Sequence, residues 1–97
     1  MPNIKLITNN DLRTVLVSIQ KTEWAMESVS GLYRYDIKDT AITADCAVDI
    51  NLDLASVEVA KSCNLKSVTN SYDGGVYIYA ETIPTSAMSG TMIVIKS

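Results

Sequence analysis

The chain has 97 residues, of which eleven are acidic and eight are basic, so its net charge is −3. The basic residues are scattered, whereas a protein that binds nucleic acid clusters them against phosphates, and we therefore expect no nucleic-acid partner. No stretch approaches the roughly 18 consecutive apolar residues that a membrane-spanning helix requires, so we expect no membrane insertion. A chain of this length forms one domain with a core of modest size.

Residues 1–20 are expected to form an N-terminal strand or helix appended to a β-rich domain of residues 21–97. Asn9 and Asn10 suit a helix N-cap. The apolar residues that follow have the i, i+3, i+4 and i+7 spacing of a short helix: Leu12, Val15, Leu16 and Ile19. A strand over residues 14–18 is the alternative, because this stretch is rich in β-branched residues. Since so short a helix is unstable alone, we predict that these four residues mediate oligomerisation.

The middle of the chain predicts strands over residues 32–38 and 46–54. Trp24 precedes them, and because the chain has no phenylalanine we expect Trp24 to be the largest side chain of the core. In the second strand, apolar residues alternate with polar or small ones, the pattern of an antiparallel strand with one buried face. The apolar set is Cys46, Val48, Ile50, Leu52 and Leu54, and the other set is Ala47, Asp49, Asn51 and Asp53.

A helix is predicted over residues 54–64, with Asp53 at its N-cap and Asn64 at its end. One side of this helix carries Leu54, Val57, Ala60 and Lys61, and the other carries Ser56 and Glu58. The strands predicted after it cover residues 65–72, 74–82 and 91–96, with a turn at Asp73-Gly74-Gly75 and a loop over residues 86–90. The fold class is therefore mainly β, with β-sandwich-like antiparallel sheets and one or two short helices. A single sheet covered by the predicted helix is the alternative.

Four tyrosines are candidate binding residues. Tyr33 and Tyr35 share one face of their strand, and Tyr77 and Tyr79 share one face of theirs. If the two strands are neighbours, the phenols form a ladder that offers a platform for sugar rings or a surface for a partner. The alternative is cross-strand aromatic pairing that stabilises the sheet or a subunit contact.

The sequence offers no catalytic residues, and we expect no enzyme. It contains no histidine, and no acidic residue falls in a motif that pairs it with a base. Asp49, Asn51 and Asp53 resemble the start of a calcium loop, but Leu54 stands where an EF-hand requires glycine, and strand alternation explains the spacing. Cys46 and Cys63 lack ligand spacing, so we expect neither a metal nor a cofactor, and both thiols are expected to be buried and free.

Several short motifs follow one another from residue 23 onward. They are Trp24, Tyr33 and Tyr35, Ile-Thr-Ala-Asp at 42–45, Val-Asp-Ile at 48–50, Gly-Val-Tyr-Ile-Tyr-Ala at 75–80 and Pro-Thr at 84–85. Their order and spacing resemble a domain of virion fibre and tail proteins from bacteriophages and prophages of Gram-positive hosts. The resemblance covers most of the chain.

The resemblance implies a structural virion protein at the tip or end of a fibre, made in the cytoplasm of the bacterial host. Its implied partners are copies of itself, with a homotrimer expected, other virion proteins, and polysaccharide on the host cell surface. The alternative function is a small carbohydrate-binding module that uses the tyrosine-lined face.

Overall fold

The computed structural model describes residues 12–96, so the N-cap predicted at Asn9 and Asn10 lies outside the described residues. In chain order, the elements are β1 (Leu12–Ile19), β2 (Ala25–Glu27), β3 (Leu32–Lys38), β4 (Ala47–Leu52), α1 (Leu54–Cys63), β5 (Leu65–Tyr72), β6 (Gly75–Ala80) and β7 (Met88–Ile95). The predicted fold class, mainly β with a short helix, is confirmed.

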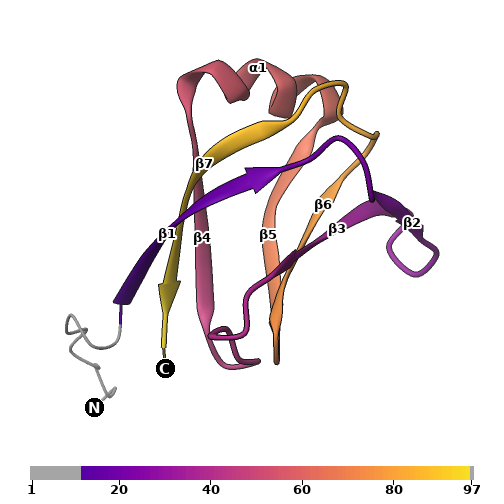
Figure 1. The fold of residues 1–97 in the computed structure, drawn as a ribbon. Helices are drawn as coiled ribbons and strands as arrows, with labels where there is room; N and C mark the ends of the chain where they lie inside the picture. The colour runs from indigo at the N-terminus through magenta and orange to yellow at the C-terminus, as the bar shows by residue number, and fades with distance from the viewer. Residues whose placement is uncertain (1–11, 97) are drawn as a thin grey trace, which may run out of the picture.

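The strands form two antiparallel sheets. Sheet A has the order β1-β7-β4, and sheet B has the order β2-β3-β6-β5. Figure 1 shows that the two sheets face each other and that α1 lies across one end of the gap between them. The sandwich-like arrangement is therefore the one that forms, and the alternative of one sheet with a helix covering its face is wrong.

The core lies between the sheets and is built by the alternation of side chains along each strand. Sheet B contributes Val76, Ile78 and Ala80 of β6, all at most 2% exposed. Sheet A contributes a matching inner face from its three strands: Val17 and Ile19, Val48, Met88, Met92 and Val94. Cys46 and Cys63 are free, as expected, and both are buried in the same core.

The helix predicted from the spacing of Leu12, Val15, Leu16 and Ile19 is wrong, because this segment is the strand β1. The strand alternative, given for residues 14–18, is correct. β1 pairs with β7 in unbroken antiparallel register, from Leu12 opposite Ile95 to Ile19 opposite Met88. Long-range pairing and the β-branched side chains therefore outweigh a helical spacing that arises by coincidence.

The helix α1 forms where it is predicted, but it turns a different side inward. Leu54 is 89% exposed, whereas Ser56 and Cys63 are buried and Ala60 packs against the core. Asn64 ends the helix as predicted, with a φ of 52°. The residue at the N-cap is Asp53, although its carboxylate accepts a hydrogen bond from Ser89 Oγ and does not cap the helix.

The strands over residues 32–38 and 65–72 match their predicted bounds, whereas β7 begins at Met88 inside the predicted 86–90 loop. Gly90 explains the difference, because a Cβ there would lie 2.2 Å from the carbonyl oxygen of Asn51 on β4. Only glycine permits this close approach of two strands, so a residue that is typical of loops is here part of a strand.

Side-chain hydrogen bonds join the two sheets along both sides of the sandwich. On one side, Thr69 Oγ1 donates to the Val48 carbonyl oxygen at 2.9 Å and Ser71 Oγ donates to the Cys46 carbonyl oxygen at 2.8 Å. These two contacts, which join β5 to β4, are called the hydroxyl seam below.

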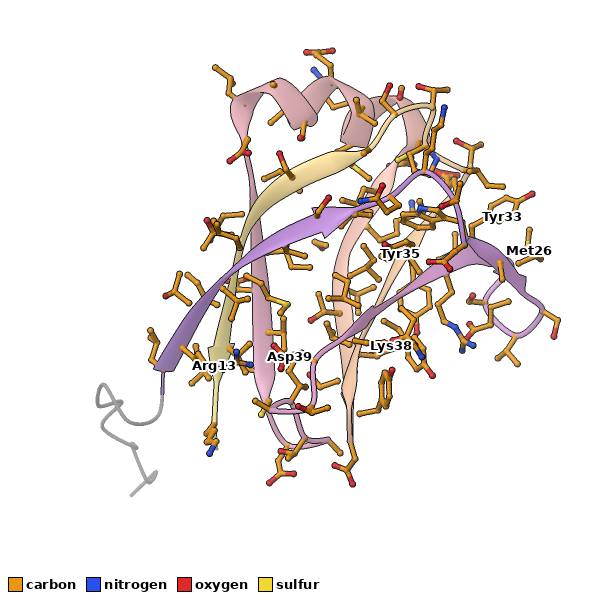
Figure 2. All side chains as sticks on the ribbon, in the orientation of Figure 1. Arg13, Met26, Tyr33, Tyr35, Lys38 and Asp39 are labelled. Carbon is orange, nitrogen blue, oxygen red and sulfur yellow. The ribbon has the colours of Figure 1, made fainter. Side chains whose placement is uncertain are left out.

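On the other side, Arg13 of β1 forms an ion pair with Asp39, just after β3, at 2.7 Å, and Figure 2 shows these two side chains facing each other. The hydrogen bond from Arg13 holds the pKa of the Asp39 carboxyl below its ordinary value. Near the other end of β1, the backbone N–H of Gln20 donates to Tyr35 Oη at 3.1 Å.

Trp24 is buried between the sheets, as predicted. Its ring centroid lies 5.2 Å from that of Tyr35, and its indole N–H donates to the Gln20 carbonyl oxygen at 2.8 Å. The polar edge of the indole is therefore satisfied while its rings fill apolar space.

Replacing Trp24 with alanine should lower the free energy of unfolding by about 3–5 kcal/mol, because the change leaves a large cavity in a small core. Urea denaturation of both proteins measures the difference. Val29→Ala is the control, because Val29 is 94% exposed and its truncation should leave the unfolding midpoint almost unchanged. A loss below about 1 kcal/mol for Trp24→Ala would contradict the role of Trp24 in the core.

Candidate functional site

The four predicted tyrosines do not form one ladder. β3 and β6 are neighbours, as the ladder requires, but the register places Tyr35 opposite Ile78 and Tyr77 opposite Asp36. Residues directly opposite each other share a sheet face, so Tyr33 and Tyr35 lie on the inner face of sheet B, whereas Tyr77 and Tyr79 lie on the outer face. Tyr35 is part of the core, and Figure 2 shows Tyr33 near Met26 of β2.

On the outer face of sheet B, both faces of the Tyr77 ring are covered. The ring of Tyr72 stacks on it at a centroid distance of 4.6 Å with 20° between the planes, and the Arg34 guanidinium lies 4.2 Å from its centroid. Tyr79 is only 6% exposed, and its hydroxyl accepts a hydrogen bond from Asn70 at 2.8 Å. These rings stabilise the sheet through aromatic and cation–π contacts, which is the alternative considered for them.

Tyr72 is the residue of this surface that the sequence did not single out. Its ring occupies the space that a side chain at Gly75 would fill, since a Cβ there would lie 2.8 Å from Tyr72 Oη and 2.5 Å from the Ile37 carbonyl oxygen. Its hydroxyl donates to Asp36 Oδ1 at 2.5 Å, so the side chain spans from β5 across β6 to β3. The signal that points to it is an aromatic residue paired with a glycine across a tight hairpin.

The hydrogen bond to Asp36 raises the pKa of Tyr72 to about 12. Ionisation of the phenol would remove this hydrogen bond and bring its negative charge close to that of the carboxylate. The hydrogen bond that raises this pKa links β5 to β3 across β6.

The four residues predicted to mediate oligomerisation are divided between the two faces of β1. Leu16 is 87% exposed and Leu12 is 40% exposed on the outer face, whereas Ile19 is fully buried and Val15 packs against the core. Ile93 and Ile95 of β7 lie on the same outer face, because they pair with Thr14 and Leu12. The four outward residues Leu12, Leu16, Ile93 and Ile95 are called the sheet A patch below.

The acidic stretch of β4 is divided in the way that strand alternation predicts. Asp49 and Asn51 are exposed on the outer face of sheet A, and Asp53 is bonded to Ser89. Within residues 12–96, no three histidine, cysteine or acidic side chains gather closely enough to hold a metal ion. The helix of this part of the chain is too short and too polar to cross a bilayer.

Neither protein-family models nor curated proteins nor solved structures give a match to this chain. The resemblance to virion fibre and tail proteins therefore rests on the motifs alone and stays a prediction.

Replacing Asp36 with asparagine should lower the pKa of Tyr72 from about 12 toward the ordinary value of a tyrosine, because the amide carries no charge. A pH titration of tyrosinate absorbance measures this, and Tyr72→Phe identifies the contribution of Tyr72 by removing it. If the last phenol to ionise has the same pKa in Asp36→Asn and in the unchanged protein, the contact with Asp36 does not control the pKa of Tyr72.

The raised pKa also predicts how stability changes at alkaline pH. The folded protein binds the Tyr72 proton more tightly than the unfolded chain, so the contribution is complete below about pH 10 and is lost as pH rises through about 12. Tyr72→Phe lacks this ionisation, so its free energy of unfolding should fall less over that interval than that of the unchanged protein.

Proposed function

We propose that the protein is a structural component of a phage or prophage virion that acts by self-association and not by catalysis. The motif order from Trp24 to Pro84-Thr85 suggests the virion, and the sheet A patch supports the self-association. The single observation that carries the proposal is the exposure of Leu16 at 87% on the same sheet face as Leu12, Ile93 and Ile95. Leu12 and Leu16 are exposed and Ile93 and Ile95 are half-buried, and a contiguous aliphatic area on a sheet face is typical of protein–protein contacts.

The charge of this face favours a second copy of the chain as the partner. The outward residues of its three strands are aliphatic or neutral polar ones, with Asp49 of β4 as the one charged side chain among them. The chain as a whole carries a net charge of −3. Two copies that meet through an almost uncharged face therefore avoid most of the like-charge repulsion that other faces would bring.

A homotrimer is the proposed assembly, because the resembled family usually associates in threes. The small core adds a thermodynamic reason for association, since a short chain buries a limited share of its own surface. The carbohydrate-binding alternative has less support, because Tyr72 and Arg34 cover the ring faces of Tyr77 that a sugar would need.

Replacing Leu16 with aspartate should convert the assembled protein to monomers, because it places an unpaired charge in an apolar contact. Light scattering behind a sizing column, at micromolar protein concentration, measures the mass. The fold should survive, since the side chain of Leu16 is solvent-exposed in the single chain.

Val29→Asp is the matched control. It introduces the same charge at a residue that is 94% exposed in the turn between β2 and β3, and it should leave the mass unchanged. A monomeric mass for the unchanged protein, or an assembled mass for Leu16→Asp, would overturn the proposed interface.

A further inference from the structure

The side of the sandwich formed by β4 and β5 is closed along one part and open along the other. The hydroxyl seam joins the strands at Cys46 and Val48. Toward α1 the two strands diverge, and α1 lies across the end of the gap (Figure 1). A cleft of about 520 Å³ lies there, between β4, β5 and α1.

One wall of the cleft is a strand edge with unused backbone groups. The Asp53 N–H donates to the Ser89 carbonyl oxygen of β7, whereas the carbonyl groups of Cys46 and Val48 point to β5. Because antiparallel strands alternate in this way, Ile50 and Leu52 also direct their N–H and C=O groups away from β7 and toward the cleft. Within residues 12–96, no hydrogen bond joins those groups of Ile50 or Leu52 to β5 or α1.

The opposite wall is the irregular part of β5. The pairing of β5 with β6 shifts between Leu65 and Thr69, so three residues of β5 oppose Tyr79 alone. An irregularity of this kind bends a strand. Beside Ile50 and Leu52, β5 therefore does not continue the hydroxyl seam, and within residues 12–96 no strand pairs with this edge of β4.

The floor of the cleft is aliphatic, and its rim carries charged side chains of both signs. Ile50, Leu65 and Ile78 line the floor, and the helix contributes Val57 and Ala60. The charged residues of the rim are Asp49, Lys61 and Lys66, and Lys66 is paired with Glu81 at 3.3 Å. The Lys61 side chain is 72% exposed, and its one ion-pair partner among residues 12–96 is the distant Glu58 at 4.0 Å, so Lys61 is available to bind an acidic group.

We propose that this cleft binds an extended polypeptide segment of another protein, which adds as a strand to β4. Backbone N–H and C=O groups that point outward at every second residue are recognised by another strand, since it offers acceptors and donors with the same spacing. Aliphatic side chains on one side of the segment fill the floor, and an acidic side chain next to α1 meets Lys61. The proposal does not depend on the virion assignment or on the sheet A patch.

The probe is a short synthetic peptide of alternating valine and glutamate, capped at both ends. We expect its addition to shift the backbone amide resonances of Ile50 and Leu52 and to slow their hydrogen exchange, because both N–H groups acquire acceptors. The same peptide with methyl groups on alternate backbone nitrogens should not bind, since it cannot pair as a strand. A valine–lysine peptide should bind more weakly, because it brings a like charge next to Lys61.

Two variants of α1 test the position of the site. Val57→Glu adds a negative charge at a residue that lines the cleft, and Leu54→Glu adds the same charge to the same helix at a residue outside the cleft. Both side chains are exposed in the folded chain, so both variants should fold. We expect Val57→Glu to weaken binding of the valine–glutamate peptide about tenfold and Leu54→Glu to leave it nearly unchanged.

Several results would overturn the proposal. They are no binding of the alternating peptide at millimolar concentration, equal binding of the methylated peptide, or equal affinities for the two helix variants. Slow exchange at Ile50 without peptide, becoming fast on dilution, would show that a second copy of this chain occupies the edge instead.

Discussion

The hairpin turn at Asp73 and Gly74 fixes the register on which the rest of the fold depends. Gly74 adopts a φ of 118°, which glycine tolerates far better than other residues, and the turn pairs Tyr72 with Gly75. The same turn also holds the connection from sheet B to sheet A. Gly74 accepts a hydrogen bond from the Asp39 N–H and donates one to the Ile42 carbonyl oxygen, both at 2.9 Å. A slip of one residue at this turn would reverse the faces of β5 against β6 and detach that connection at once.

This register explains which part of the tyrosine surface is readable from sequence. Alternation within one strand is local. The sequence alone therefore shows that Tyr77 and Tyr79 share one face of their strand and that Tyr33 and Tyr35 share one face of theirs. The offset between β3 and β6 is a long-range property, and it alone places the first pair outside and the second pair inside. The role of Tyr72 depends on the local hairpin and on the long-range register. Its ring needs the space at Gly75, and its hydroxyl needs Asp36 from a third strand.

Prediction from the sequence fails most clearly where the polar or apolar pattern of a segment depends on a partner strand that is distant in the sequence. The spacing from Leu12 to Ile19 fits a helix locally, and only the presence of β7 as a pairing partner makes it a strand. Thr69 and Ser71 make β5 appear to be a polar surface strand, yet their hydroxyls bond to the carbonyl groups of β4 and so replace the backbone pairing that the two strand edges lack. By contrast, the residues on the inner faces of β4 and β6 can be predicted from the sequence, because apolar and polar residues alternate along each strand. The apolar set faces the core whichever strands lie beside it.

Hydrogen bonds and an ion pair between side chains thus join the two sheets at the sides of the sandwich, and these contacts determine which strand edges stay open to a partner. A neutral hydrogen bond contributes about 1 kcal/mol, so the two contacts of the hydroxyl seam stabilise the closure of β4 on β5 only modestly. They also cover the edge of β4 at Cys46 and Val48, whereas at Ile50 and Leu52 no strand of residues 12–96 pairs with β4 on the side away from β7. An uncovered edge is where another strand adds. Sheet A has three strands, and the sheet A patch lies on its outer face. A segment added to β4 would become the fourth strand of that sheet, so the two proposed contacts would share one sheet. Occupation of the cleft would then widen the face that is proposed for self-association.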